Sequence, residues 1–395
     1  MAHVDIESGF QYYACMKPRL LGILAALTLA CSTTDDPEDA SLSADEVAPV
    51  AETYAQIVAA SYTDSRTAAE ALELALDALV ADPSEATLEA ARQAWLDARE
   101  PYGQTEVYRF YDGPIDNPDD GPEGQLNAWP MDEAYVDYVD GAPDSGIIND
   151  ATTYPTIDAA LLASLNEAGG ETNISTGYHA IEFLLWGQDM NPDGPGARAA
   201  SDYATDGSST VDNPERRGAY VLAAAELLIS DLSGLEAAWA SGYVDEFNSA
   251  DPQEVVRRIL LGMGSLSGAE LAGERMNVAL ETMDQEDEHS CFSDNTHRDI
   301  INNARGIENV YLGRYGEVDG PGIYDLVAAR DPSLADRLRD ELAASVAAAE
   351  AIPAPFDRAI VDHREAVQAT IDALRLQADT IVEVATLFEI NLALE

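Results

Sequence analysis

The residues best suited to chemistry lie in one short segment, 177–187, which reads GYHAIEFLLWG. Apart from Tyr178, its only ionisable side chains are His179 and Glu182. A helix that is apolar on nearly every side is buried, and a buried carboxylate is costly unless it is paired or bound to a metal. Residues three apart share one helix face, and His and Glu at this spacing hold iron and similar ions in helical bundles. The segment therefore predicts a metal site on a buried helix.

A structural interpretation of the same pair is also open. His179 would then be a core histidine, and Arg99 or Arg109 would neutralise Glu182. The spacing alone does not choose between the two interpretations.

The elements that position these residues are predicted to be helices. Apolar residues recur at spacings of three and four, and no segment shows a strand alternation that competes. The sequence therefore predicts an all-α protein. The expected helices are 54–80, 85–109, 176–186, 220–240, 254–283, 302–315, 333–351 and 356–394.

Two pairs of matching strings indicate an internal duplication. Asp82-Pro83-Ser84-Glu85 resembles Asp251-Pro252-Gln253-Glu254, and in each we expect an N-cap aspartate, a proline at the first helical position and a glutamate at the third. Ile181-Glu182 followed by Gly187 likewise resembles Ile307-Glu308 followed by Gly313. The two offsets differ by about the length of a turn-rich stretch, 112–151, which the second half lacks.

One insertion reconciles both matches. We therefore predict two tandem, pseudo-repeated bundles of the four-helix type, 48–212 and 213–395, with a long ordered loop inserted in the first. In the second half Arg305 and Glu308 occupy the positions of His179 and Glu182. We expect these two side chains to form an ion pair that needs no further partner. The histidine would then be a site added to one half.

The N-terminal region has the features of a secretory signal. Lys17 and Arg19 precede the apolar run 20–30, which is too short to span a bilayer and ends at Cys31, so 1–30 is predicted to be a signal peptide. Met16 is a more natural start than Met1. The string Thr28-Leu29-Ala30-Cys31 resembles a bacterial lipobox, and it predicts lipidation of Cys31 followed by an acidic tether, 31–47. We expect an exported protein, anchored on the periplasmic face of the outer membrane or at the cell surface.

The composition limits the possible partners. Lys and Arg total 21 against 73 Asp and Glu, a formal charge of −52. Nucleic acid and anionic lipid surfaces would be repelled, so the lipid anchor is the only membrane contact that we expect. Of the three cysteines, Cys291 is left without a disulfide partner in the mature chain, and we expect a packed, inert thiol.

Several segments together resemble the imelysin-like family, and within it the branch called iron-regulated protein A. The resemblance covers 50–394. It is carried by Gly177-Tyr178-His179-Ala180-Ile181-Glu182, which is similar to the GxHxxE signature, and by the segments 95–110, 112–116 and 287–297. It implies two packed four-helix bundles with a site in the cleft between them, and a periplasmic or surface lipoprotein that takes part in iron uptake, with iron-transport proteins as possible partners.

The resemblance also extends the set of candidate ligands. Glu106 lies in one of the similar segments, and His289, Asp294 and His297 lie in another. The ligands are expected to be oriented by hydrogen bonds from neighbouring residues, namely Arg99, Arg109 and Glu308. Nitrogen and oxygen ligands favour iron, with zinc less favoured. Calcium is also less favoured, because the string that begins at Asp189 has only the first half of an EF-hand loop, with Ala200 where a bidentate Glu would be needed.

The family also carries a peptidase label, which is the alternative prediction. This chain has no His-Glu-x-x-His motif, and Phe183 follows Glu182 where an inverted zincin would need a second His. No catalytic residue is therefore predicted, and a binding protein is favoured over an enzyme. A third possibility is a purely structural surface module, in which His179 and Glu182 only satisfy the core.

Overall fold

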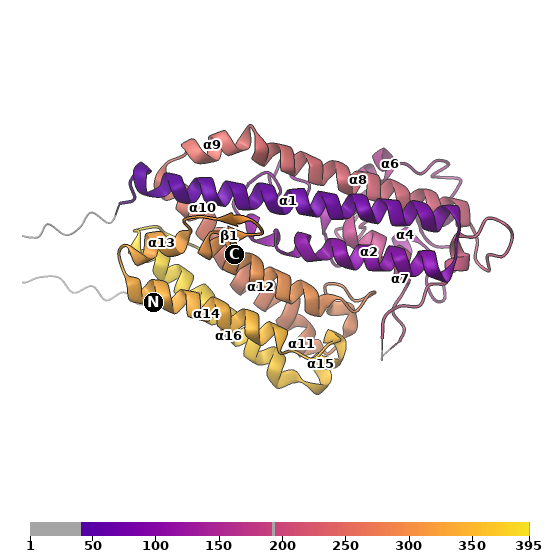
Figure 1. Cartoon of the computed structure of the whole chain (residues 1–395). Coiled ribbons are helices and arrows are strands. Elements are labelled where there is room, and N and C mark those ends of the chain that lie inside the picture. Colours follow the sequence, from indigo (N-terminus) through magenta and orange to yellow (C-terminus); the bar gives the residue numbers. More distant parts are fainter. Residues whose placement is uncertain (1–40, 192–193, 395) are drawn as a thin grey trace, which may run out of the picture. The chain divides into compact units, whose positions relative to one another are not determined.

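A helix of 38 residues, α1 (Ala44–Ala81), organises the first of two groups of helices in the computed structural model, which describes residues 41–191 and 194–394 (Figure 1). α2 (Glu85–Gly103) and α8 (Pro214–Ala240) pack along α1, and α7 (Gly177–Trp186) packs on both α2 and α8. The buried side chains of α1 recur at spacings of three and four, from Ile57 and Val58 to Leu76 and Leu79. This group surrounds α7 with apolar side chains.

The second group, drawn from salmon through orange to yellow in Figure 1, begins with a long and irregular helix. α10 (Pro252–Ser265) continues into a π-helical segment, η3 (Leu266–Asn277), and then into α11 (Val278–Thr282). α12 (Thr296–Leu312), α14 (Pro332–Glu350) and α16 (Arg364–Leu387) pack in sequence, and α16 returns onto η3. The two groups meet where α12 packs on α2 and α10 packs on α1.

The prediction of an all-α protein is confirmed. In the described residues the strands are β1 (Arg314–Tyr315) and β2 (Val318–Asp319), which form one short antiparallel pair with Arg314 opposite Asp319. The remaining elements are short helices. They are η1 (Glu106–Tyr108), α3 (Glu123–Leu126), α4 (Glu133–Val136), α5 (Gly146–Asn149), α6 (Ala159–Leu165), η2 (Ala200–Tyr203), α9 (Tyr243–Ser249), η4 (Gln285–Asp287), α13 (Ile323–Ala328) and α15 (Phe356–Asp362).

The boundary expected near residue 213 needs correction. α8 lies in the half that we assigned to the second bundle, but it packs on α1 and α7 of the first group. The apolar side chains of α8 are buried in these contacts. Four of them are at most 1% exposed, namely Tyr220, Val221, Leu228 and Leu232. The second group therefore begins with α10, whose start is the one that resembles the start of α2.

The two matching helix starts differ in detail. α10 begins as predicted, since Asp251 is the N-cap, its Oδ1 accepts from the amide of Gln253 at 3.0 Å, and Pro252 is the first helical residue. α2 was predicted to have Asp82 as its N-cap, but Asp82 instead follows the end of α1. Ser84 caps α2 and accepts from the amide of Thr87 at 3.3 Å. The amide of Asp82 still donates to the carbonyl of Ala78 at 3.0 Å, so Asp82 ends α1 and Ser84 takes the N-cap position of α2.

The N-terminal predictions fall mostly outside the described residues. The signal segment, Met16 and Cys31 all lie within 1–40. The tether, however, was expected to extend to residue 47, whereas α1 already begins at Ala44. Glu46 accepts from the amide and the hydroxyl of Ser43 at 2.9 and 2.6 Å, so the last residues of the acidic stretch cap and start the helix.

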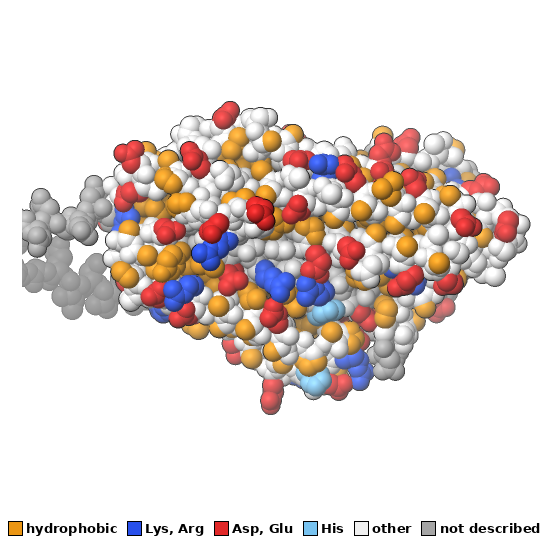
Figure 2. Space-filling view, viewed as in Figure 1, with side chains coloured by type: hydrophobic (Ala, Val, Ile, Leu, Met, Phe, Trp, Pro, Cys, Tyr) orange, Lys and Arg blue, Asp and Glu red, His pale blue; other side chains and the backbone are white. Residues whose placement is uncertain are grey.

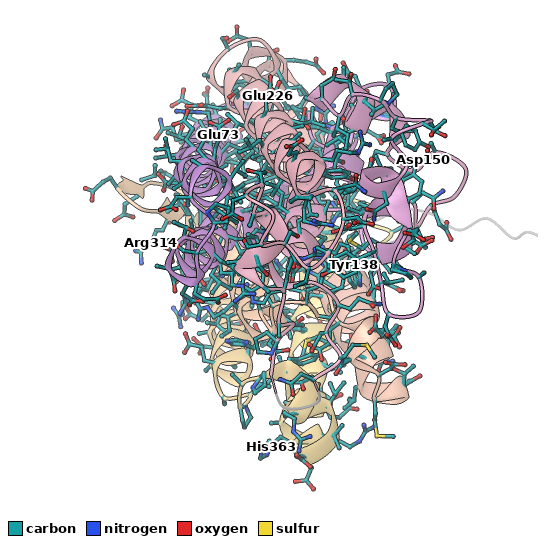
Figure 3. The ribbon with its side chains drawn as sticks, turned by 90° about the vertical axis from the view of Figure 1, so that its right-hand side faces the viewer. Glu73, Tyr138, Asp150, Glu226, Arg314 and His363 are labelled. Atoms are coloured by element: carbon teal, nitrogen blue, oxygen red, sulfur yellow. The ribbon has the colours of Figure 1, made fainter. Side chains whose placement is uncertain are left out.

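The inserted stretch 112–151 is ordered and packs against the first group, as the sequence predicted. Its apolar side chains are buried, among them Leu126, Val136 and Ile148, each 0% exposed. Asp137 accepts from Arg217 of α8 at 2.7 and 2.9 Å, so the insertion is also held by a buried ion pair. Figure 3 places Tyr138 and Asp150 of the insertion beside the first group and His363 at the far end of the second.

One described helix, α8, has the length and composition of a membrane-spanning segment. Half of that apolar window is buried inside the structure, against α1 and α7. This is the pattern of a core helix.

Candidate metal site where the two groups of helices meet

α7 carries the first candidate pair, and glycine makes its position possible. Gly177, the first residue of α7, has φ +79°, and a Cβ at this position would lie 2.5 Å from the carbonyl oxygen of Leu126 in the insertion. Only glycine fits here. Every residue of α7 is buried, and the indole of Trp95 donates to the carbonyl of Tyr178 at 2.9 Å. The insertion and α2 therefore fix the helix on which His179 and Glu182 lie.

His179 and Glu182 pair with one another. His179 Nδ1 lies 2.9 Å from Glu182 Oε2, and neither side chain is exposed. Glu182 Oε1 accepts from the amide of Ser293 at 3.0 Å and from its hydroxyl at 2.6 Å. The expectation that Arg99 or Arg109 would neutralise Glu182 directly is therefore wrong, since both arginines bind other carboxylates.

Burial sets the ionisation of this pair. It raises the pKa of Glu182 to about 8, although the donors of Ser293 oppose the shift. Burial also holds the pKa of His179 well below its ordinary value, and the neighbouring His289 lowers it further. His179 is therefore a neutral imidazole at pH 7.

A second pair comes from the other group of helices. The ring of His289 lies 4.7 Å from that of His179, centroid to centroid, and the two rings meet edge to face. His289 Nδ1 lies 3.2 Å from Asp299 Oδ2, and Arg99 donates to Asp299 Oδ1 at 3.0 and 3.2 Å. The guanidinium of Arg99 holds the pKa of Asp299 far below its usual range despite burial. Asp299 is thus ionised.

The charge of Asp299 assigns the tautomer of His289. Burial and the guanidinium of Arg275 lower the pKa of His289 to about 4, so its ring is neutral at pH 7. An ionised carboxylate only accepts, so Nδ1 carries the proton and Nε2 keeps its lone pair. Asn127 Nδ2 donates to that lone pair at 3.4 Å. His179 Nε2 has no hydrogen-bond partner within the described structure.

These two pairs share the arrangement that metal-binding histidines use. In such sites the far ring nitrogen of the histidine donates to a carboxylate or a carbonyl, which orients the ring and raises its basicity. Here Glu182 and Asp299 engage Nδ1 of His179 and His289, so Nε2 of each ring is the nitrogen that is left for a ligand. Among residues 41–191 and 194–394, however, no three His, Cys, Asp or Glu side chains form a ready set of metal ligands.

Glu106 lies close to the pairs but is already engaged. Its Oε1 accepts from Asn127 Nδ2 at 3.1 Å, and its Oε2 accepts from Arg275 at 2.6 Å and from Arg109 at 3.0 Å. These guanidiniums outweigh burial and lower the pKa of Glu106 to about 2. Arg109 and Arg275 therefore hold the carboxylate of Glu106 as a structural anion, with both of its oxygens engaged.

A cleft of about 470 Å³ opens beside these groups. Asn127, Trp129 and His289 line it, together with Arg109 and Arg275. The ring of Trp129 also lies 5.1 Å from that of His179. His289 is therefore the imidazole at the cleft, and His179 lies directly behind it.

Asp294 and His297 lie beside this site without joining either pair. Asp294 is 8% exposed, and burial together with the carboxylates of Asp357 and Asp189 raises its pKa to about 7. His297 Nδ1 lies 3.1 Å from the carbonyl oxygen of Asp294, which is a local loop contact. Neither side chain forms a hydrogen bond or ion pair with His179 or Glu182 in the described part of the chain.

Four further expectations concern residues outside the two pairs. Arg305 was predicted to pair with Glu308, but it donates to Glu350 of α14 at 2.6 Å on the surface, because α14 packs along α12. Glu308, which was expected to support the ligands, is half-buried and feels the charge of Arg305, and no hydrogen bond or ion pair in the described part of the chain links it to either histidine–carboxylate pair. Asp189 forms an ordinary turn by accepting from the amide of Asn191 at 2.9 Å, and Cys291 is a buried free thiol.

The sequence interpretation missed Asp299, Ser293, Asn127 and Arg275. Asp299 lies ten residues beyond His289, on the first turns of α12, so no helical spacing links the two. Ser293 and Asn127 reach the site from a loop and from the insertion. The density of polar residues in 287–303 was the available signal, since so many polar side chains beside a helix start indicate a network.

The fold and this network define a class of protein. It is an all-α protein whose described helices form two groups, with a histidine and a carboxylate paired on each side of the region where the groups meet. Residues 58–381 match the family model of imelysin, and the chain belongs to the imelysin family. The resemblance drawn from the GxHxxE string is thereby confirmed.

Individual relatives agree with this assignment. The chain is 26% identical over 358 residues to "Iron-regulated protein A" of Synechococcus elongatus, a match that covers 83% of this chain and 84% of the relative. An iron-regulated protein A precursor from Parabacteroides distasonis has the same fold, with a TM-score of 0.66, 19% identity, and coverage of 87% of this chain and 96% of the other. An imelysin-like protein from Psychrobacter arcticum also has a TM-score of 0.66, with 16% identity and coverage of 89% and 98%.

Proposed function

We propose that this protein binds a metal ion through Nε2 of His179 and of His289. One observation carries the proposal: two neutral imidazoles, one from each group of helices, lie in ring contact, and a carboxylate engages Nδ1 of each. A purely structural histidine needs no such duplication. His179 Nε2 is buried and has no hydrogen-bond partner in the described structure. A buried polar atom without a partner costs free energy, and a bound metal ion would remove that cost.

Iron is the first candidate for the ion. Imidazole nitrogen suits iron and zinc, and no thiolate competes in the described residues, because the one cysteine there is buried and its pKa is raised well above the ordinary value. The name of the Synechococcus relative supports iron over zinc. The described residues contribute fewer than three ligands as they stand, so we expect water or a small molecule carried by the ion to complete the coordination.

The geometry favours binding over catalysis. A zinc peptidase needs three protein ligands around an open position, together with a base that activates water. Glu182 could serve as a base, but it is buried behind His179 and bonded to Ser293. Peptide hydrolysis therefore remains the alternative to test, and metal-dependent cleavage that is lost in Glu182→Ala would establish it.

We further propose that the site operates outside the cytoplasm, on a chain anchored through Cys31. The support is the signal-like N-terminal sequence and the strongly acidic composition. A role in iron uptake would bring the chain next to iron-transport proteins. Labelling of cells with an alkyne palmitate tests the anchor: we expect a labelled protein in the membrane fraction, and loss of both the label and the membrane association in Cys31→Ala.

The metal proposal is tested on the full chain after a chelator has removed bound ions. We expect about one Fe²⁺ or Zn²⁺ per chain by elemental analysis, and affinity lowered on the order of 100-fold or more in His179→Ala and in His289→Ala. His179→Gln, which keeps the size of the side chain, guards against a folding defect. His363→Ala is the matched control, because His363 is exposed and should leave the affinity unchanged. Equal affinity in all these variants would reject the proposal.

A further inference from the structure

The cleft beside His289 is dominated by carboxylates. Six acidic side chains line it against the two guanidiniums of Arg109 and Arg275. They come from four parts of the chain: the insertion, the loop after α6, the π-helical segment η3, and η4. These residues are Glu123, Glu167, Glu270, Glu274, Glu286 and Asp287.

The two guanidiniums are not available to a ligand. Arg109 pairs with Glu106 at 3.0 Å, Glu123 at 3.1 Å and Glu270 at 3.6 Å. Arg275 pairs with Glu106 at 2.6 Å and with Glu270 at 2.8 Å. η3 makes the last of these contacts possible, since the wide turn of a π-helix puts residues five apart on one side. The two positive charges of the cleft are thus committed to protein carboxylates.

The remaining acids are uncompensated. Glu167, Glu274, Glu286 and Asp287 form no ion pair within the described part of the chain. The pKa of Glu286 is raised to about 7, first by burial and then by neighbouring carboxylates that include Glu133 and Asp284. This local field is negative even in a protein whose surface is acidic in general. Figure 2 shows acidic side chains over one whole face, with the fewer basic ones gathered mainly over α12 and α14.

We infer that this cleft admits its metal as a small hydrated cation and excludes the anionic chelates in which iron is often carried. The inference rests on the proposed function and names the form of the substrate. A concave surface lined by one sign of charge raises the local concentration of oppositely charged ions and speeds their association. An anionic chelate would meet the same field as a barrier, and no free guanidinium in the cleft would receive it.

The rate of cation entry tests the inference. Trp129 lines the cleft and lies beside His179, so a paramagnetic ion bound there should quench its fluorescence. Stopped-flow mixing with Co²⁺ at low salt gives both rate constants, and Trp129→Phe assigns the signal. In the triple variant Glu274→Gln, Glu286→Gln, Asp287→Asn we expect association about 10-fold slower and dissociation unchanged, with the difference shrinking as salt is added.

A charge-matched control separates the cleft from the net charge of the protein. Glu52, Glu226 and Asp379 are exposed and lie outside the cleft. Their conversion to Gln, Gln and Asn should leave the association rate within about twofold of wild type, because exposed charges far from the path are screened. Equal slowing by the two triple variants would overturn the inference, and so would no slowing by either.

The ligand form is tested with ferric citrate. We expect the wild-type chain to bind Co²⁺ and to show no saturable binding of the ferric citrate anion. Binding of ferric citrate that is lost in His179→Ala would overturn the charge selection while leaving the imidazole site intact. Absence of Co²⁺ binding in the wild type would reject the inference together with the proposed function, so the two failures are distinguishable.

Discussion

The two histidine–carboxylate pairs have the same geometry and opposite electrostatics. Glu182 is held by the amide and hydroxyl of Ser293, which are neutral donors, and its pKa rises to about 8. Asp299 is held by the guanidinium of Arg99, and its pKa falls far below the usual range. The comparison shows that burial alone does not decide the charge of a carboxylate. The charge of a buried carboxylate also depends on whether its hydrogen-bond donors are neutral, as at Glu182, or charged, as at Asp299.

This difference divides the roles of the two pairs. Asp299 is an ionised anchor that fixes the tautomer of His289. Glu182 is neutral or nearly so at pH 7, so its Oε2 donates a proton to His179 Nδ1 at 2.9 Å, and a metal ion on Nε2 would displace one proton from this pair. Arg99 also lies over the rings of Trp95, Tyr102 and Tyr178, with 5.0 Å to the centroid of Tyr178. The His289–Asp299 pair therefore keeps its charge over the physiological pH range, whereas the His179–Glu182 pair changes its protonation there.

The largest expected effect is that of breaking the anchored pair. Asp299→Asn keeps the shape but leaves the buried Arg99 without its counter-charge, so we expect a loss of about 3–5 kcal/mol of unfolding free energy. Chemical denaturation measures it. Glu100→Gln is the control, because it also breaks a pair with an arginine, Arg298, but on a partly exposed surface, and it should cost less than about 1 kcal/mol. Similar losses in the two variants would show that Arg99 does not hold Asp299 as described.

The His179–Glu182 pair should make the unfolding free energy depend on pH. The folded pKa of Glu182, about 8, lies above the unfolded value, so the native state binds more protons than the unfolded state between those values. The unfolding free energy of the metal-free wild type should therefore fall as pH rises from 5 to 8, by up to about 1.4 kcal/mol per pH unit from this group. Glu182→Gln removes that contribution, so its stability relative to wild type should increase with pH. Parallel curves would contradict the assignment.

The smallest effect is expected where the second half has its equivalent of His179. Arg305 pairs with Glu350, and the two side chains are 38% and 48% exposed. Arg305→Ala should change the unfolding free energy by no more than about 0.5 kcal/mol and leave metal uptake unchanged. Glu350→Ala should behave in the same way. A large loss in either variant would show that this surface ion pair has a structural role that its exposure does not indicate.

The helices could be predicted because their signals are local. Apolar spacing marked α7, α8 and α14 within a few residues, and Asp251-Pro252 marked the start of α10. The grouping of helices could not be predicted in the same way. Whether α8 packs on α1 or on α10 depends on side chains far apart in the sequence, and the repeat pattern is compatible with both.

The site could be predicted in part for the same reason. His179 and Glu182 lie on one turn of one helix, so their spacing identified them. His289 was found through its segment, but its partner Asp299 was not, because a loop and a helix start separate them. Glu106 had the residue type of a ligand, and only the structure shows that Arg275 and Arg109 occupy its oxygens. Competition for a side chain is invisible in the sequence.

The most direct test of the central claim is anomalous diffraction from crystals of the full chain soaked in Zn²⁺ or grown with Fe²⁺. We predict a peak about 2.0–2.2 Å from Nε2 of both His179 and His289, with Glu182 and Asp299 still on the Nδ1 atoms. Crystals of His179→Ala should lack that peak. A peak surrounded only by carboxylate oxygens, or a wild-type site that holds no metal under these conditions, would contradict the account.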